Sequence, residues 1–169
     1  MKGNPKGRIT ADEIVQAAIQ MEELGKDFYE ALGAVCADRK TRELCKRLAN
    51  EETHHTEVFR KMRSELAKQG KTVLLTARET ADIRRALRSG NLPDAETIRR
   101  IAASGKVADL LAMAIETETN TIRYYTEMAQ HVSDRAAVQA VIQEEQSHVK
   151  NLQTLVERLQ QGKVGDVGD

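Results

Sequence analysis

The stretch AVIQEEQSHVKNL, residues 140–152, places apolar side chains at the spacing of one helix face and interrupts that face twice. The apolar positions on this face are Val138, Val141, Leu152, Leu155 and Leu159. Such a stripe predicts a helix that packs against partner helices. Between Val141 and Leu152 the same steps of three or four residues pass through Glu145 and His148, so an acid and an imidazole stand where leucines are expected. The pattern predicts that both polar side chains are buried.

The composition is that of a helical protein. Aromatic residues make up 3% of the 169 residues, tryptophan is absent and prolines number 2, whereas strong helix formers are abundant. The length suits one domain with a sizeable core. The 26 basic and 26 acidic residues give a formal net charge of +0, so no nucleic-acid partner is expected.

The sequence also bears on the cellular location. The N-terminal MKGNPKGRIT lacks the apolar run of a signal peptide, and no stretch approaches the roughly 20 apolar residues that span a bilayer. We therefore expect a soluble, cytoplasmic protein without a membrane partner. Cys36 and Cys45 form neither a zinc ribbon nor a disulfide framework, and they are expected to fill apolar space near a helix turn.

Four long periodic segments are expected to be helices. They run from the N-cap Thr10 to about Cys36, from the turn at 38–41 to about Gln69, from about Gly105 to His131, and from a cap at Ser133 or Asp134 to about residue 160. Short turns make each successive pair an antiparallel hairpin. Residues 1–160 are therefore expected to form one bundle, and 161–169 (QGKVGDVGD) to form a disordered tail.

The connection between the second and third helices is too long for a turn. Residues 71–105 contain helical patterns of their own at about 79–89 and 94–103, and the segment could cross the bundle from end to end. The predicted fold is all-α, a four-helix bundle built from two hairpins with one long crossover.

Each of the other three long helices also carries an acid on its apolar stripe. The stripes read Val15, Ala18, Glu22, Gly25, Tyr29, Leu32, then Cys45, Leu48, Glu52, His55, Phe59, Met62, Leu66, and then Leu111, Ala114, Glu118, Thr121, Tyr125, Met128. An acid and a tyrosine are seven residues apart in the first and third helices, and ExxH occurs in the second and fourth. The chain therefore resembles a duplicated hairpin, which would arrange equivalent groups around a pseudo-twofold axis.

Four carboxylates buried in one core require a counter-charge, because their repulsion and desolvation add. Two divalent cations would balance them, and two neutral imidazoles would complete the ligand set. One Glu from each of two helices and one ExxH from each of the other two is the pattern of ferritin-like di-iron and di-manganese proteins. The predicted metal ligands are Glu22, Glu52, His55, Glu118, Glu145 and His148.

Neighbouring polar residues can be sorted by their helical phase. Those that lie one position or more off the stripes, about 100° per residue away, are Glu23, Glu51, His54, Glu116 and Glu144. They are expected to be solvated or to support the ligands from outside. Tyr29 and Tyr125 lie on the stripes and are candidate catalytic residues, because a buried phenol needs a partner and a ligand carboxylate could accept its hydrogen bond.

The segments IQMEELGKDFYE, LANEETHHTEVF, AIETETNTIRYY and VIQEEQSHVKNL resemble the four ligand-bearing helices of rubrerythrin-like proteins of the ferritin-like superfamily. The resemblance covers roughly residues 11–160. It implies a di-iron centre, Mn being possible, in which Glu52 and Glu145 bridge, and it implies a homodimer. Thr121 stands where those proteins carry a further carboxylate, so the ligand switching of their peroxidase reaction is not implied.

The resemblance and the ligand set imply an oxidoreductase that reduces hydrogen peroxide or O2. The chain lacks the four cysteines of a rubredoxin domain, so electrons are expected from an external donor such as a rubredoxin. Residues 78–106 carry an excess of positive charge that is either an ordinary solvated face or a docking surface for that donor; the basic residues are Arg78, Arg84, Arg85, Arg88, Arg99, Arg100 and Lys106. Two alternatives stay open: a ferroxidase that handles iron, and a metal-stabilised interaction module without turnover.

Overall fold

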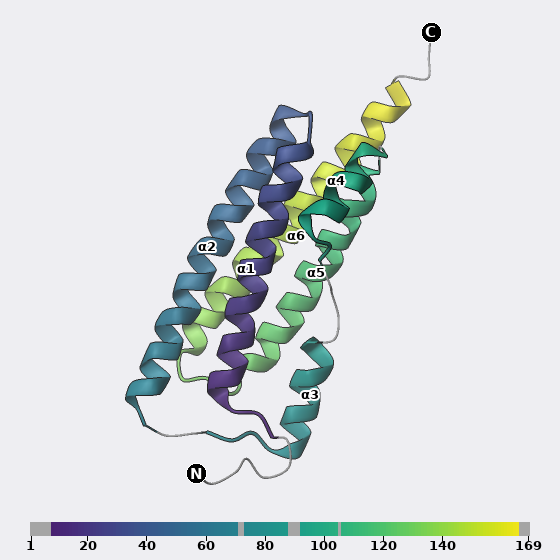
Figure 1. Ribbon diagram of the computed structural model, residues 1–169. Helices are drawn as coiled ribbons and strands as arrows, with labels where there is room; N and C mark the ends of the chain where they lie inside the picture. Colours follow the sequence, from purple (N-terminus) through teal and green to yellow (C-terminus); the bar gives the residue numbers. More distant parts are fainter. Residues whose placement is uncertain (1–7, 71–72, 88–91, 105, 166–169) are drawn as a thin grey trace.

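The computed structural model describes residues 8–70, 73–87, 92–104 and 106–165. Its helices are α1 (Ala11–Val35), α2 (Arg39–Lys68), α3 (Ala77–Leu87), α4 (Ala95–Ala103), α5 (Val107–Met128) and α6 (Arg135–Gly165). Figure 1 shows the four long helices running side by side along one axis. Within the described residues, none of these helices is long and apolar enough to cross a membrane.

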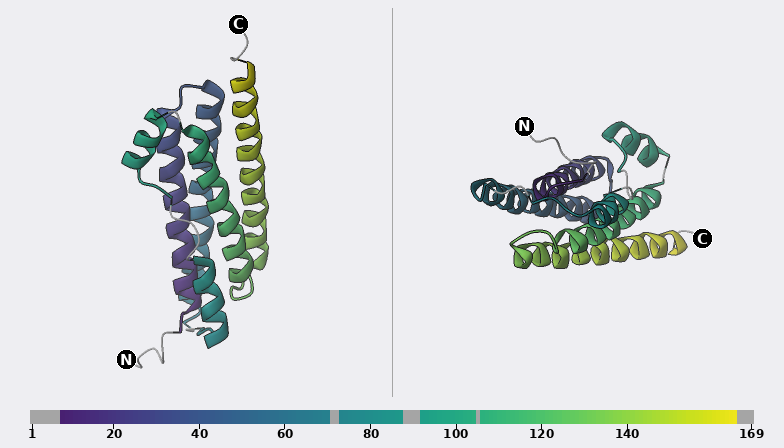
Figure 2. Two further views of the ribbon diagram at one scale, coloured as in Figure 1. Left: turned by 90° about the vertical axis from the view of Figure 1, so that its right-hand side faces the viewer. Right: turned by 90° about the horizontal axis from the view of Figure 1, so that it is seen from below.

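The bundle consists of two antiparallel hairpins, as predicted. Helix α1 packs along α2 and α5 packs along α6, while α1 lies next to α5 and α2 next to α6. The right-hand view in Figure 2 shows the two pairs as separate layers. The prediction of an all-α four-helix bundle with a long connection between its second and third long helices is confirmed.

The crossover between α2 and α5 lies against the side of the bundle formed by α1 and α5. Residues 73–75 first pair with residues 9–11, through Ala11 N to Val73 O (3.1 Å) and Leu75 N to Ile9 O (3.0 Å). Helix α3 then packs on α5, and α4 packs on both α1 and α5. In Figure 1 these two short helices lie near opposite ends of the bundle, so the crossover runs along its length.

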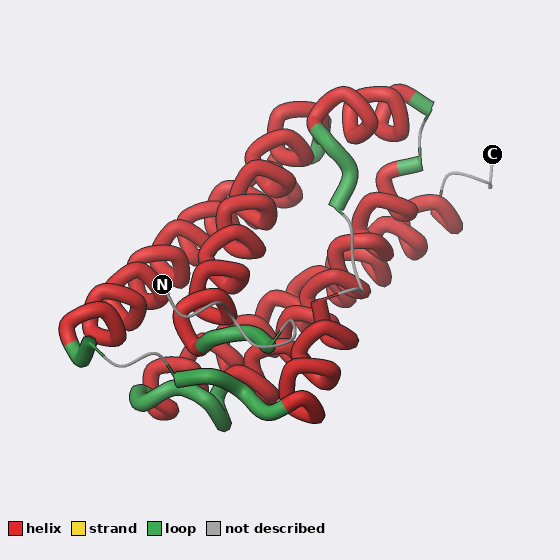
Figure 3. Tube along the Cα trace, turned by 60° about the horizontal axis from the view of Figure 1, so that its bottom comes forward, coloured by secondary structure: helices red, strands yellow, loops and turns green. Residues whose placement is uncertain are grey.

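Local hydrogen bonds explain where the long helices begin and end. Thr10 caps α1, and its hydroxyl accepts from Glu13 N (3.1 Å) while the Glu13 carboxylate accepts from Thr10 N (2.7 Å), which completes a capping box. Asp134 caps α6 by accepting from Ala137 N at 3.0 Å. Gly70 follows α2 with a φ of 62°, a left-handed conformation that glycine adopts without a side-chain clash. Figure 3 shows the described loops at such helix ends and in the crossover.

Two boundaries differ from the sequence prediction. Helix α5 ends at Met128 instead of His131, because the chain tightens into a turn in which His131 N donates to Met128 O at 2.9 Å. Helix α6 continues to Gly165, into the segment 161–169 predicted to be a disordered tail. Its glycine at position 162 weakens the helix without ending it. Arg88, Gly105 and residues 166–169 lie outside the described residues.

The apolar core is divided into two clusters along the bundle axis. The first cluster includes Ile14, Phe59, Tyr125, Met128 and Val141. The second includes Tyr29, Leu32, Leu48, Leu111 and Leu152. On all four long helices the predicted acids lie between the positions that contribute to the two clusters, so the polar site interrupts a core that is otherwise continuous.

Candidate metal centre

The six predicted ligand side chains converge at the middle of the bundle. All six are buried, with exposed fractions between 0% for His55 and Glu145 and 6% for Glu118. They form two overlapping groups, Glu22, Glu52, His55 and Glu145, and Glu52, Glu118, Glu145 and His148. In each group, the potential ligand atoms lie within 4.8 Å of one another. Glu52 and Glu145 belong to both groups.

The two shared acids face both groups with different oxygens. Glu145 Oε1 lies 3.0 Å from His55 Nδ1, and Glu145 Oε2 lies 2.9 Å from His148 Nδ1. Glu52 Oε2 lies 3.5 Å from His55 Nδ1, and Glu52 Oε1 lies 3.5 Å from His148 Nδ1. This is the geometry required of a carboxylate that bridges two cations. Glu22 and Glu118 each approach one histidine, at 3.3 Å and 3.8 Å respectively.

The outer nitrogen of each histidine contacts an acid from the other hairpin. His55 Nε2 lies 2.7 Å from the Glu144 carboxylate, and His148 Nε2 lies 3.0 Å from that of Glu51. If Nε2 donates this hydrogen bond, Nδ1 keeps its lone pair directed into the centre. The two rings stack at 5.6 Å between centroids. The carboxylates of Glu51 and Glu144 therefore set the orientation of both imidazoles.

The two stripe tyrosines are also paired across the hairpins. The Tyr29 hydroxyl donates to Glu118, and the Tyr125 hydroxyl donates to Glu22. Tyr29 belongs to one apolar cluster and Tyr125 to the other, so the two rings close the centre from opposite ends of the bundle. Burial raises the pKa of both phenols, and the nearby carboxylates raise them further, so both phenols stay protonated and keep donating.

The protein chain by itself holds protons on its clustered acids. Burial raises the pKa of Glu145 to about 8, with a further contribution from the charges of Glu118 and Glu22. Burial and the charge of Glu145 raise the pKa of Glu52 well above its ordinary value. Both shifts follow from placing like charges close together in a medium that solvates them poorly.

The pKa values of the two histidines are raised by their acidic neighbours. Burial lowers the pKa of His55, but Glu145, Glu22 and Glu52 together outweigh burial, and the net pKa is raised. The pKa of His148 is raised in the same way, with Glu118 as the strongest partner. Burial raises the pKa of Glu118, yet its interactions with His148, Glu145 and Tyr29 together lower it below its usual value. Bound protons thus reduce the negative charge of this site.

The residues present fit a pair of cations. Both carboxylate oxygens of Glu145 and Nδ1 of His148 are buried without a hydrogen-bond partner, although such atoms are normally satisfied. The donor set of four carboxylates and two imidazoles suits iron or manganese and contains no thiolate. The absence of a side chain at Gly25 on α1 makes space for the Glu52 carboxylate, since a Cβ atom there would lie 3.3 Å from the Glu52 carboxyl carbon. A larger residue at position 25 would press on a shared acid.

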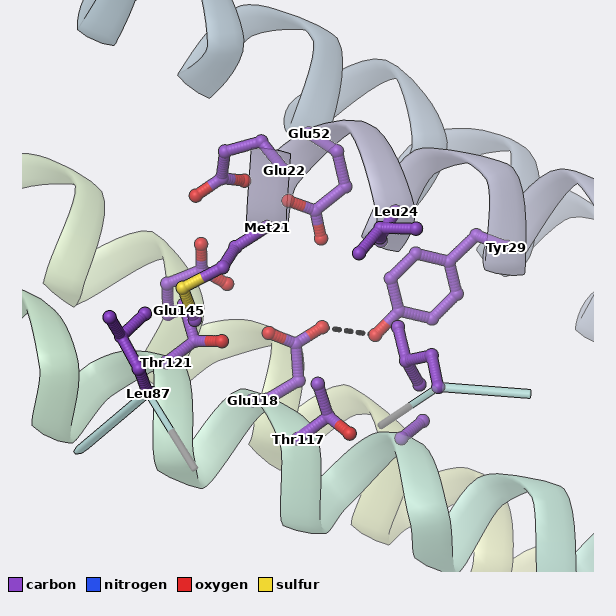
Figure 4. A pocket seen from close by; sticks show the side chains of 13 residues that line it. Met21, Glu22, Leu24, Tyr29, Glu52, Leu87, Thr117, Glu118, Thr121 and Glu145 are labelled. Atoms are coloured by element: carbon purple, nitrogen blue, oxygen red, sulfur yellow. Dashed lines mark hydrogen bonds between the residues drawn. The ribbon is translucent and has the colours of Figure 1, made fainter. Parts of the chain in front are cut away.

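The centre is accessible from one side. A pocket of about 210 Å³ lies between α1 and α5, and the four ligand acids contribute to its wall. Figure 4 shows these carboxylates pointing toward one another at the pocket, with Thr117 and Thr121 beside them. We call this side the open face. The α2/α6 side, where His55 and His148 are backed by Glu51 and Glu144, is called the closed face; its imidazoles are at most 1% exposed.

Helical phase separated most of the neighbouring polar groups correctly. His54 and Glu116 are exposed, and the exposed Glu23 pairs with Arg60 at 2.7 Å. The specific contacts of Glu51 and Glu144 were not foreseen from the sequence. The signal that could have found them is the repeated EExxH, in which the first acid precedes the ligand acid in both hairpins.

The fold and the site together define a class, the ferritin-like helical proteins with a dinuclear carboxylate and histidine centre. The chain belongs to the rubrerythrin family, whose model matches residues 13–102. That match contains Glu22, Glu52 and His55. The other half of the candidate centre, Glu118, Glu145 and His148, lies outside the matched residues and rests on the helical spacing and on the structure.

Two solved structures share this fold. A protein from Thermotoga maritima, described as a ferritin-like diiron-carboxylate protein, has a TM-score of 0.69 and 23% identity, covering 89% of this chain and 96% of that one. A hypothetical protein from Pyrococcus furiosus has a TM-score of 0.65 and 19% identity, covering 89% and 90%. No curated protein matches the sequence.

Proposed function

We propose that this chain is a di-iron oxidoreductase that reduces hydrogen peroxide or O2 with electrons from an external carrier such as a rubredoxin. The observation that carries the proposal is the shared pair Glu52 and Glu145, whose oxygens face both ligand groups at the wall of an accessible pocket. Two iron ions bound there would supply two electrons in one reaction, the number needed to cleave an O–O bond.

The protein's own groups would hold this centre in a fixed geometry. Glu22 and His55 would serve one metal and Glu118 and His148 the other, with Glu52 and Glu145 shared. The phenols of Tyr29 and Tyr125 would hold the two terminal acids in place by donating to them.

Access supports a reaction with a dissolved small molecule. The open face exposes the acids to the pocket, whereas the closed face buries the imidazoles. A substrate would therefore approach between α1 and α5, at the side where the ligand carboxylates are exposed to the pocket. Electron supply by a separate carrier and assembly as a homodimer are further parts of this proposal.

The test is metal analysis followed by reaction with oxidant. Protein loaded with Fe(II) without oxygen should bind about two ions per chain. One equivalent of hydrogen peroxide should then oxidise both ions, giving an absorption change that saturates at that ratio, and a reduced carrier should reverse it. Iron that peroxide leaves in the ferrous state would contradict the proposal.

The same experiment separates the two alternatives. Continued oxidation and storage of Fe(II) beyond about two ions per chain would identify a ferroxidase, for which iron is also a substrate. Metal that binds in stoichiometric amount, does not exchange and does not react would identify a non-catalytic module.

A further inference from the structure

The pocket on the open face is larger than a peroxide requires. Its volume is about 210 Å³, whereas one water molecule occupies roughly 30 Å³ of liquid. Hydrogen peroxide has two heavy atoms, so it would fill a small part of this space. The remaining volume must hold either water or a larger part of a substrate.

The walls away from the acids are mainly apolar. They are formed by Met21, Leu24, Leu87, Leu92 and Ala114. Leu24 is 61% exposed and Leu87 is 39% exposed, which makes them two of the three large exposed apolar side chains among the described residues. Apolar side chains left exposed around a concave site are typical of ligand binding, because a bound apolar group removes them from water.

The polar end of the pocket restricts the chemistry of the ligand. Four carboxylates face it, and its described lining residues include no lysine or arginine. A ligand with an anionic head would meet these acids without a cationic partner among the described residues. A neutral molecule with a small polar head and an apolar substituent fits both ends.

We propose that the pocket takes an organic hydroperoxide, with its substituent against Met21, Leu24 and Leu87 and its hydroperoxide group toward Glu118 and Glu145. This inference rests on the proposed function and names its substrate class. The O–O bond of ROOH breaks, and with two electrons and two protons the products are ROH and water. The two electrons would be supplied by iron held by the predicted ligand acids and histidines and replenished by the external carrier, and the protons would come from solvent.

The first test is a binding measurement that does not depend on turnover. Protein loaded with redox-inert Zn²⁺ is titrated with 2-phenyl-2-propanol, the alcohol formed from cumene hydroperoxide, and binding is followed by calorimetry and NMR. The parent should bind it. Thr117→Phe, which fills the pocket from α5, should lower the affinity at least about tenfold. Thr119→Phe, the same change at an exposed position two residues away, should not.

The second test compares substrates on the iron-loaded protein. Thr117→Phe should lower kcat/KM for cumene hydroperoxide at least about tenfold more than kcat/KM for hydrogen peroxide. Leu24→Glu, at a position that is 61% exposed, repeats the test without altering the core. The inference would be overturned if the zinc-loaded parent bound no alcohol. It would also be overturned if the variants lowered kcat/KM for both peroxides by the same factor.

The two proposals fail in different ways. Reduction of hydrogen peroxide without reduction of cumene hydroperoxide would overturn the organic substrate alone. Reduction of neither would overturn the proposed function on which it rests.

Discussion

The open face of the centre is formed by α1 and α5 and the closed face by α2 and α6, so each face takes one helix from each hairpin, yet the two faces differ in what lies outside the predicted ligands. On the closed face, Glu51 and Glu144 each hold a histidine of the opposite hairpin. On the open face no such pair of acids lies behind the carboxylates among the described residues, and a pocket reaches them. The comparison teaches that one face holds the two histidines in a fixed orientation while the other leaves a pocket beside the acids.

The largest expected effect comes from removing an acid that both faces share. Glu145→Ala should lower the metal content from about two ions per chain to one or fewer, because Glu145 faces both ligand groups. Metal analysis after gel filtration measures this. Gln146→Ala, on the exposed side of the same helix, is the matched control and should keep full metal content. Equal loss in both variants would show that the helix face has been misassigned.

The hydrogen bonds of the closed face can be removed without substituting a predicted metal ligand. Glu51→Ala and Glu144→Ala should each weaken metal affinity about 10- to 100-fold, since a histidine ligand loses the carboxylate that orients it. With metal in excess, the metal content should still be near normal. Competition with a chelator measures the affinity, and Glu116→Ala, which removes an exposed acid from α5, is the control. Unchanged affinity in both variants would mean that the two faces do not differ in this way.

The pH dependence of the metal-free protein tests both faces together. The pKa of Glu145 is raised to about 8, and those of Glu52 and both histidines are also raised, so the folded state binds more protons than the unfolded state at neutral pH. Stability then falls as pH rises through the window from about 5 to 8. The lowered pKa of Glu118 has the opposite effect on stability. This effect is confined to pH values below the ordinary pKa of a glutamate, which lie outside this window.

The melting temperature of metal-free protein should therefore drop on the order of 5–10 °C between pH 5 and 8. Metal-loaded protein should not show this drop, because cations replace the protons. A metal-free melting temperature that is constant over this range and equal to that of the loaded protein would contradict the prediction.

The open face can be narrowed at Gly25. Gly25→Ala adds a Cβ atom 3.3 Å from the Glu52 carboxyl carbon, so the shared acid must move by a few tenths of an ångström. Metal affinity should fall roughly three- to tenfold. Stability of the metal-free protein should change by less than about 1 kcal/mol, because alanine also favours the helix.

Gly33→Ala provides a control of the same kind on the same helix. Its added Cβ would lie 3.2 Å from the Cβ of Cys45, which is not in the metal centre. This variant should leave metal affinity unchanged. A loss of affinity as large as that in Gly25→Ala would assign the effect to α1 as a whole.

The smallest expected effect concerns the crossover, which packs on the helices of the open face. Arg84 and Arg85 are exposed on α3, and Arg85 pairs with Asp82 at 3.4 Å. If an acidic electron carrier docks here, reversing both arginines to glutamate should slow reduction of the oxidised centre about two- to fivefold at low salt. Raising the salt concentration should remove the difference. The same reversal at the exposed Lys46 and Arg47 on α2 is the control, and equal rates in all three proteins would place electron entry elsewhere.

The sequence by itself determined the four long helices and which of their polar side chains are buried. Steps of three and four residues define the stripe of a long helix, and a polar residue on that stripe is buried with its neighbours whatever the helix packs against. Glu145 and His148 could therefore be assigned to the interior from spacing alone, and the repeated ExxH indicated the other half of the centre. The capping pair Thr10 and Glu13 fixed the start of α1 for an equally local reason.

Only the tertiary structure decided which groups from different helices touch. The contacts from Glu144 to His55 and from Tyr29 to Glu118 join the two hairpins, across 89 positions of sequence in each case. No helical period spans such a separation, because the distance depends on how the hairpins pack. The pocket between α1 and α5 depends on the same packing. So does the role of Gly25, whose missing side chain leaves room for the carboxylate of Glu52 on the neighbouring helix.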